Sequence, residues 1–198
     1  MTTFARLSLW ALIVPTIAAC SKTVEWQEEV LLNTGDTIWV NRTVEYGIRG
    51  AGGNPFDLGY RLQKSEKLSF LWKGRKYVYH GDADLILLAI SPQEIPVLIA
   101  PAANKNWDWS HDYHCTTPHY VQLVPHGTST AWTWPPKIER WVYGLPTNLL
   151  GTRPAPGQTK AKYTAVEKAQ ADTIALLQAP YRRKIEATYT TIDCKHGG

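Results

Sequence analysis

The sequence predicts a mainly β domain, an antiparallel sandwich or open barrel that carries one C-terminal helix. Three observations support this fold class. Apolar and polar residues alternate along several segments separated by turn residues, which is the pattern of half-buried antiparallel strands. One pair of segments is apolar on both faces, and a single stretch near the end of the chain has helical spacing. Neither an internal repeat nor a second domain is visible in the sequence.

The first strands form a predicted hairpin over residues 24–48. Apolar residues recur at every second position on both sides of Asn-Thr-Gly-Asp at 33–36, which is a turn sequence. Two charges interrupt the apolar rows, Glu28 on the first strand and Arg42 on the second. Because opposite charges on neighbouring strands attract each other, we expect these two side chains to pair across the ladder.

Further strands are expected along the middle of the chain. Residues 47–60 read as a flexible Gly-rich turn, because the Lys-Ser or Lys-Thr of a phosphate-binding loop does not follow. A second hairpin is expected over 68–81 and a buried pair of strands over 85–101. Residues 119–125 supply another strand.

The last third of the chain changes character. Residues 132–160 are rich in Pro, Gly and Trp without a lasting period, so we expect an irregular wrap. A helix is predicted over about 164–178, where Thr164 and Glu167 form a capping box and Pro180 stops the helix. Its expected apolar stripe consists of Val166, Ala169, Thr173, Ile174 and Leu177.

The start of the chain has the order of a secretory signal segment. Arg6 precedes an apolar run over 7–17, and small residues then lead to Cys20. The run is too short for a hydrocarbon core, which requires about 20 residues in a helix. We therefore expect residues 1–19 to be removed. The four residues 17–20, Ile-Ala-Ala-Cys, resemble the lipobox of bacterial lipoproteins.

This resemblance covers only the first 20 residues, and it implies a lipid anchor. The Cys20 thiol would receive a diacylglyceryl group and its new amino terminus an acyl chain such as palmitate, which together hold a protein firmly on a membrane. The mature domain would then span 20–198, with a short lipid-proximal tether at its start. Ser21 follows the cysteine, where this class reserves Asp for inner-membrane retention, so the periplasmic face of the outer membrane is favoured. The body of the chain resembles other bacterial lipoproteins of no characterised family, and that resemblance supplies no functional residues.

The net charge argues against nucleic-acid binding, and the cysteine content predicts a disulfide. The formal net charge of +4 falls by one when Arg6 is removed, and scattered charges of this size give no footprint for nucleic acid. Cys115 and Cys194 remain after Cys20 is assigned to lipid. Two thiols in an oxidising compartment usually pair, so we expect a disulfide between them.

The densest group of reactive side chains is WDWSHDYHC at 107–115. In an extended conformation, alternate side chains share a face. Trp107, Trp109, His111, Tyr113 and Cys115 would lie on one face, and Asp108, Ser110, Asp112 and His114 on the other. The alternation favours an aromatic core face that ends at the disulfide.

Chemical interpretations of the same segment stay open. As an exposed loop it would offer a binding surface, with Trp107, Trp109, His111, Tyr113, His114 and His119 as its candidate residues. The zinc-ligand types in this stretch are His111, His114, Cys115 and His119, although neither HExxH nor Cys-x-x-Cys spacing occurs. Cys115 cannot be both a thiolate ligand and half of a disulfide, which leaves the three histidines. A Gly-x-Ser-x-Gly elbow and a Ser-x-x-Lys motif are also missing from the mature sequence.

Together these features predict a non-enzymatic, lipid-anchored protein of the bacterial envelope. It would contact the membrane through its anchor, bind another envelope component, either protein or glycan, and need no cofactor. An inhibitor or immunity lipoprotein is one alternative. A metal-dependent hydrolase that uses the histidines of 111–119 is the other.

Overall fold

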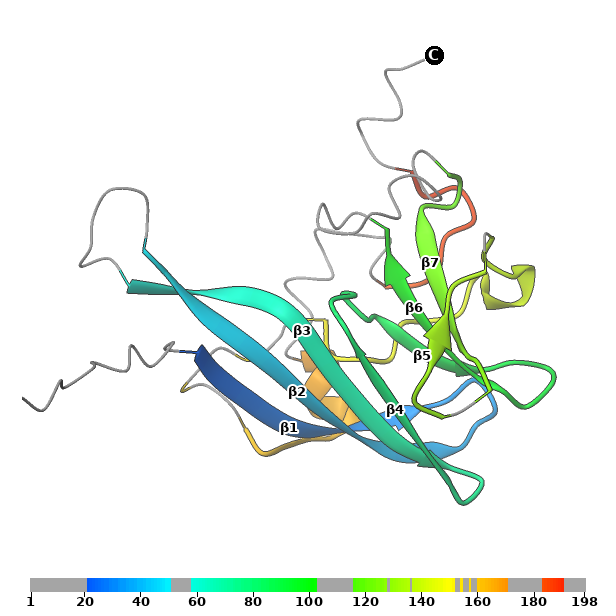
Figure 1. Cartoon of the computed structure of the whole chain (residues 1–198). Coiled ribbons are helices and arrows are strands. Elements are labelled where there is room, and N and C mark those ends of the chain that lie inside the picture. The colour runs from blue at the N-terminus through cyan, green and yellow to red at the C-terminus, as the bar shows by residue number, and fades with distance from the viewer. Residues whose placement is uncertain are drawn as a thin grey trace, which may run out of the picture.

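Two β-sheets pack face to face in the computed structural model, with a short helix and irregular segments beside them (Figure 1). The structure describes residues 21–50, 58–102, 116–127, 129–135, 137–151, 154, 157, 160–170 and 183–190. The strand order is β4-β3-β2-β1-β9 in the first sheet and β5-β6-β7-β8 in the second. The element bounds are β1 (Ser21–Leu31), β2 (Thr37–Gly50), β3 (Leu58–Trp72), β4 (Arg75–Gly81), β5 (Leu87–Ile90), β6 (Pro96–Pro101), β7 (Tyr120–Pro125), β8 (Trp132–Thr133), the 3-10 helix η1 (Arg140–Val142) and β9 (Lys162–Tyr163). The predicted mainly β class is confirmed, and of the two predicted architectures the sandwich is the one that fits.

The first sheet is built from the predicted hairpin and a longer one that overlaps it. β1 and β2 are antiparallel with Val30 opposite Ile38, and Gly35 takes the positive φ of 90° that their turn requires. β3 pairs with the other side of β2 and β4 pairs with β3, as the second predicted hairpin requires. Lys73 and Gly74 in that turn both have positive φ, which matches the twist of the two strands.

The Gly-rich segment 47–60 is a correction to the sequence prediction. β2 continues to Gly50 and β3 already begins at Leu58, so both ends of the expected loop are paired strand. Residues 51–57 lie outside the described part of the chain. Ladder hydrogen bonds join backbone groups whatever the side chain, so the pairing continues through glycines that sequence rules assign to a turn.

The second sheet is apolar on both faces because both faces are covered. β5 and β6 are buried at every position, as predicted for residues 85–101, and β7 confirms the strand expected over 119–125. Leu88, Leu98 and Leu123 meet the inner face of the first sheet in the main core. On the opposite face, Ile99 and its neighbours pack against Val142 and other residues of the irregular C-terminal third. Both faces therefore require hydrophobic side chains.

Two asparagine side chains complete the free edge of β5. Asn33 accepts a hydrogen bond from the Ile90 N–H at 2.7 Å and donates to the Ile90 carbonyl at 2.9 Å. Asn148 accepts from the Leu88 N–H at 2.9 Å and donates to the Leu88 carbonyl at 2.7 Å. Each amide therefore replaces the peptide group of a neighbouring strand. The Asn148 amide also donates to the Leu31 carbonyl at 2.9 Å, which joins the edge of β5 to β1.

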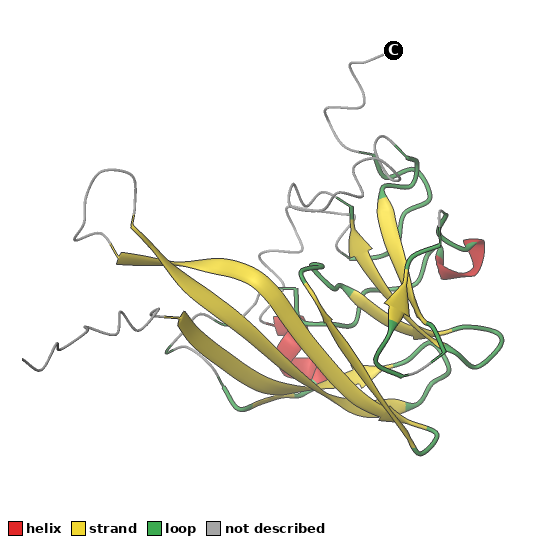
Figure 2. Ribbon diagram, in the orientation of Figure 1, coloured by secondary structure: helices red, strands yellow, loops and turns green. Residues whose placement is uncertain are grey.

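The C-terminal third has the irregular character that its composition predicts. Within its described residues the regular elements are the short β8, η1 and β9 and one short helix, and loops connect them (Figure 2). A helix begins after Thr164 and is described as far as residue 170. The capping box is confirmed, since the Glu167 N–H donates to Thr164 Oγ1 at 3.3 Å and the Thr164 N–H donates to Glu167 Oε2 at 2.9 Å. Hydrogen bonds from Lys160 and then from Thr164 lower the pKa of Glu167 to about 2.

The predicted stripe of this helix is wrong at its start. Val166 is 68 % exposed, whereas Lys168 is buried. Polar contacts fix the rotation of this first turn, because Glu29 accepts a hydrogen bond from the Ala165 N–H at 2.9 Å and Lys168 reaches a buried carboxylate of the first sheet. Ala169 is exposed as well, and Thr173, Ile174 and Leu177 lie outside the described residues. Within the described chain, no helix has the length and apolar character needed to cross a membrane.

Candidate functional site

Most residues singled out in the sequence lie outside the described part of the chain. They are Cys20, Trp107, Trp109, His111, Tyr113, His114, Cys115 and Cys194. The expected lipidation, the expected disulfide and the two-faced arrangement of 107–115 therefore stay predictions. Among the described residues, no three His, Cys, Asp or Glu side chains gather as a metal site requires.

His119 is the one predicted site residue that the structure describes. It is 6 % exposed, and its ring packs edge-on against Tyr189 with the centroids 6.2 Å apart. Its N–H donates to the Tyr189 carbonyl at 2.8 Å, and its carbonyl accepts from the Ala102 N–H at 3.0 Å. His119 therefore lies inside the fold, where it joins the start of β7 to the C-terminal segment.

A cluster of buried charges lies on the inner face of the first sheet, with Arg42 at its centre. Arg42 Nη1 donates to Glu28 Oε1 at 2.9 Å, and Arg42 Nε donates to Glu66 Oε1 at 2.8 Å. A second guanidinium nitrogen of Arg42 also contacts Glu66. The guanidinium carbon lies 5.1 Å from the centroid of the Trp26 ring. The predicted cross-strand pair of Glu28 and Arg42 is therefore confirmed, as a diagonal pair, since Trp26 is the residue directly opposite Arg42.

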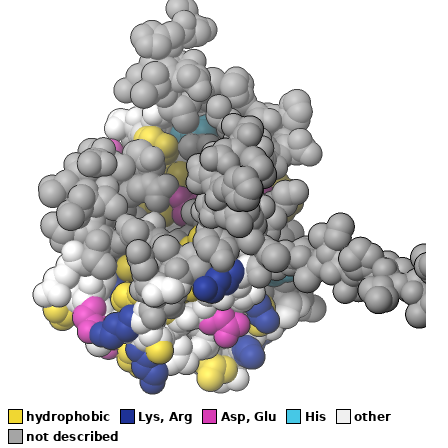
Figure 3. Space-filling view, turned by 90° about the vertical axis from the view of Figure 1, so that its left-hand side faces the viewer, with side chains coloured by type: hydrophobic (Ala, Val, Ile, Leu, Met, Phe, Trp, Pro, Cys, Tyr) yellow, Lys and Arg dark blue, Asp and Glu magenta, His cyan; other side chains and the backbone are white. Residues whose placement is uncertain are grey.

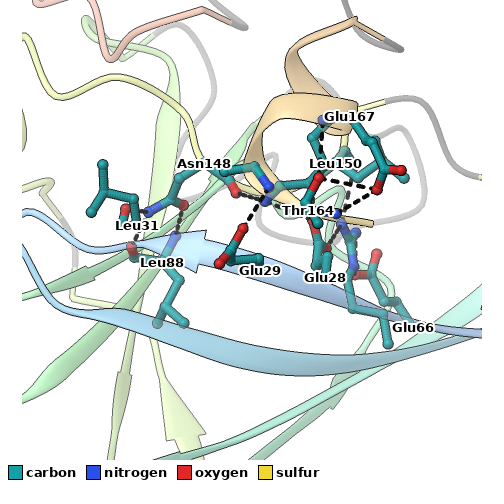
Figure 4. A network of polar contacts seen from close by, with 12 residues as sticks. Glu28, Glu29, Leu31, Glu66, Leu88, Asn148, Leu150, Thr164 and Glu167 are labelled. Atoms are coloured by element: carbon teal, nitrogen blue, oxygen red, sulfur yellow. Dashed lines mark hydrogen bonds and ion pairs between the residues drawn. The ribbon is translucent and has the colours of Figure 1, made fainter. Parts of the chain in front are cut away.

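The second oxygen of Glu28 connects this cluster to the C-terminal third (Figure 4). Glu28 Oε2 lies 3.1 Å from Lys168 Nζ and accepts a hydrogen bond from the Leu150 N–H at 2.7 Å. Arg42 Nη1 in turn donates to the Leu150 carbonyl at 3.0 Å, and Lys168 donates to the carbonyl of Asn148. The two acids and two bases thus clamp the segment around 148–150 and the first turn of the helix onto the sheet.

Sequence reasoning missed Glu66 and Lys168. Glu66 occupies the same alternating row as Leu68 and Phe70, and this signal could have placed it inward. Lys168 carries no comparable signal, because its partner Glu28 is distant in the sequence. Burial alone lowers the pKa of Arg42, but the attraction of Glu66 and Glu28 outweighs it, so the pKa lies above its ordinary value. The guanidinium therefore stays charged, and the cluster holds fixed charges inside the fold.

A cavity of about 300 Å³ adjoins this cluster between β1 and the helix. Its wall is formed by Glu29, Leu31, Pro146, Thr147, Asn148, Leu149, Ala165, Lys168 and Ala169. The polar groups of this wall are already engaged in the fold. Lys168 contacts Glu28, Glu29 caps the Ala165 N–H, and the Asn148 amide bonds to β5. The cavity thus offers a ligand mainly apolar contacts.

The outer face of the first sheet carries a larger groove, of about 490 Å³, over β2, β3 and β4. Its lining residues are Thr37, Ile38, Trp39, Asn41, Ser69, Phe70, Leu71 and Lys76. Trp39 is 44 % exposed and Leu71 is 63 % exposed. The register sets Asn41 opposite Ser69, and the next outward-facing positions along the two strands are Trp39 and Leu71. The groove therefore has an apolar row beside a polar row, both running across the strands.

Polar groups around this groove remain available to a ligand. Those that make no hydrogen bond within the described part of the chain are Thr37 Oγ1, Trp39 Nε1, Asn41 Nδ2, Ser69 Oγ and Lys76 Nζ. Asn41 is held in place by its other amide atom, because Oδ1 accepts a hydrogen bond from Gln27 Nε2 at 2.7 Å. A donor set that is oriented but unused can bind a partner with little rearrangement.

Charge is mixed on the face of the molecule that lies at the left of Figure 1. Where the first sheet lies, at the lower end of the space-filling view, described hydrophobic, basic and acidic side chains are interspersed (Figure 3). The described lining of the groove itself holds one ionisable residue, Lys76, so a partner would be selected there by contact with individual side chains. The sequence held one signal for this groove, since Trp39 occupies the polar row of β2 between the inward-facing Ile38 and Val40.

Comparison of the chain with protein-family models, with curated proteins and with solved structures finds no match.

Proposed function

We propose that this protein is a non-enzymatic, lipid-anchored component of the bacterial envelope, and that it binds another envelope component through the groove over β2, β3 and β4. The observation that carries the proposal is the exposed pair of Trp39 and Leu71 beside unused hydrogen-bond donors. Large aromatic side chains in partly desolvated settings supply most of the energy of recognition surfaces.

The fold supports binding because the groove lies on a stiff platform. The backbones of β2 and β3 are paired on both sides, and the buried cluster around Arg42 fixes the opposite face of the same strands. Side chains held on such a sheet lose little conformational freedom when a partner arrives.

The first residue of β1 and the groove lie at opposite ends of that strand. Ser21, next to the proposed lipidated Cys20, pairs with Gly47, whereas Trp39 pairs with Glu29 at the other end. Glu29 follows Ser21 by eight positions along the strand, which corresponds to about 26 Å at the ordinary rise per residue. This spacing supports the proposal, because a groove at that distance stands clear of the lipid head groups.

The anchor is tested by metabolic labelling with radioactive palmitate in a bacterial host. We expect the label in the wild-type chain and its loss in Cys20→Ala, together with release of the protein from sedimented membranes. A Cys115→Ala variant should keep the label and serves as the control. An unlabelled wild-type chain, or equal labelling of Cys20→Ala, would contradict the anchor.

The binding face is tested by in-cell photo-crosslinking, with a photoreactive phenylalanine analogue placed at position 71. We expect adducts from this position and none from position 166, because Val166 is as exposed as Leu71 but lies on the helix. Mass spectrometry of the adduct identifies the bound component. Failure of position 71 to give an adduct, or equal adducts from both positions, would count against the groove as the binding face.

A further inference from the structure

We infer that the groove over β2, β3 and β4 binds a neutral glycan, one pyranose ring of which stacks on Trp39. This inference deepens the proposed function, and depends on it only for the envelope as the source of the glycan. A pyranose ring has a face of C–H bonds and an edge of hydroxyl groups. It therefore needs an apolar surface and hydrogen-bonding side chains next to each other.

The two rows of the groove supply that pair of surfaces. Neighbouring strands lie about 4.8 Å apart, and successive outward positions on one strand about 7 Å apart. Trp39 and Leu71 form the apolar row, and Asn41 and Ser69 form the polar row beside it. A sugar ring that lies on the indole of Trp39 thus places its hydroxyl edge within reach of the Asn41 amide and the Ser69 hydroxyl.

The charge of the lining favours a neutral ligand. Lys76 is the only ionisable residue among the described residues that line the groove. The other polar lining side chains, Thr37, Asn41 and Ser69, are uncharged, and together they present both donors and acceptors. Hydroxyl groups, which also donate and accept, match this set better than carboxylates or phosphates do, since those groups only accept at neutral pH.

The indole of Trp39 has one side directed to the groove. Lys162 Nζ lies 5.5 Å from the centroid of its ring. Lys162 belongs to β9, which lies beyond β1, whereas the groove lies toward β3 and β4 in the strand order. The ammonium therefore comes from the β1 side of Trp39, whereas the groove lies on its β3 side.

The position of the groove also favours a glycan over a peptide. A peptide most readily joins a sheet by adding a strand to a free edge, where unpaired N–H and carbonyl groups are available. β2 and β3 are central strands whose backbones are already paired on both sides. A ligand at this groove can use side chains alone, and the large exposed apolar side chains that line it are Trp39 and Leu71. Dense hydroxyl groups on a small apolar face fit such a surface.

The test uses the full chain, labelled with ¹⁵N and titrated with cellohexaose and with chitohexaose. The chain has nine tryptophans, and the indole N–H resonance of Trp39 is identified by its loss in Trp39→Phe. We expect a saturable shift of this resonance with at least one hexaose. Binding by the variants is followed through backbone amide resonances, which all of them retain. Trp39→Ala should weaken binding at least tenfold, Trp39→Phe should retain most of it, and Asn41→Ala should weaken it severalfold.

Trp134→Ala is the matched control, because Trp134 is 48 % exposed but does not line the groove. This variant should bind as the wild type does, and unchanged spectra elsewhere show that each variant is folded. The inference is overturned if neither hexaose shifts the Trp39 resonance up to about 10 mM, where even weak binding registers, or if Trp39→Ala binds normally. If position 71 gives a protein adduct and neither hexaose binds, the glycan is refuted and the proposed function stands. If a hexaose binds but the chain takes up no palmitate, only the anchor is refuted.

Discussion

Replacement of Arg42 by methionine tests whether the buried charge cluster holds the domain together. Arg42→Met keeps a long side chain but removes the guanidinium that bonds to both Glu28 and Glu66. Glu28 retains Lys168 and the Leu150 N–H, whereas Glu66 loses both of its contacts with the guanidinium. Removal of one partner from a buried ion pair costs about 3–5 kcal/mol.

That loss is large for a domain of this size, whose free energy of unfolding is of order 5–15 kcal/mol. With a urea dependence of about 2 kcal/mol per molar, the midpoint of unfolding should fall by about 2 M. Urea titration followed by tryptophan fluorescence measures this shift at neutral pH. The double variant with Glu66→Met should lose less stability than the two single variants combined, because it removes both partners of one pair.

Lys73→Met is the matched control for Arg42→Met. It also removes a cation from an ion pair, but Lys73 and its partner Glu94 are 54 % and 67 % exposed. Exposed pairs contribute about 0–1 kcal/mol, so this variant should unfold close to the wild-type midpoint. If Arg42→Met loses no more stability than Lys73→Met, the cluster does not hold the C-terminal third on the sheet and the reasoning fails.

Three further predictions concern the edge of β5, the helix cap and the cysteines. Asn148→Ala should lower the free energy of unfolding by about 1–3 kcal/mol for each buried backbone group it leaves unpaired, and an equal midpoint for the variant and wild type in urea would contradict the capping role. Thr164→Ala should cost about 1 kcal/mol by the same assay, while Thr164→Ser stays near wild type. The pKa of Glu167 is lowered to about 2 from an ordinary value of 4.5, so its contribution is complete above about pH 4.5 and is lost as the pH falls toward 2; Glu167→Gln should abolish that step in a circular-dichroism titration. Cys115 and Cys194 should resist alkylation in unfolded, unreduced protein, and labelling of both would disprove the disulfide.

The sequence predicted those parts of the fold that depend on neighbouring residues. Alternation and turn residues located the hairpin of β1 and β2, because strand periodicity and turn chemistry are local properties. The capping box at Thr164 could be recognised in the sequence for the same reason. Glu28 and Arg42 could be paired because both interrupt apolar rows on strands joined by one turn.

Contacts between segments that are distant in the sequence could not be predicted from it. Lys168 reads as an ordinary polar helix residue, and its burial follows from Glu28, to which only the folded chain brings it. Val166 was placed on the apolar stripe because spacing cannot show how contacts with the sheet rotate the first turn of a helix. Trp39 and Leu71 likewise became a groove only once the register of β2 and β3 set them side by side.

The two asparagine amides on β5 have a consequence for the behaviour of the protein at high concentration. β5 is short and entirely apolar, and an unprotected edge of this kind is a template for pairing with another chain and for amyloid growth. Charged residues or prolines protect such edges in many proteins, but a charge would not fit between two hydrophobic layers. Asn33 and Asn148 fill the hydrogen-bonding positions along this edge without adding charge. They allow a sheet that is buried on both faces to end without recruiting a second molecule.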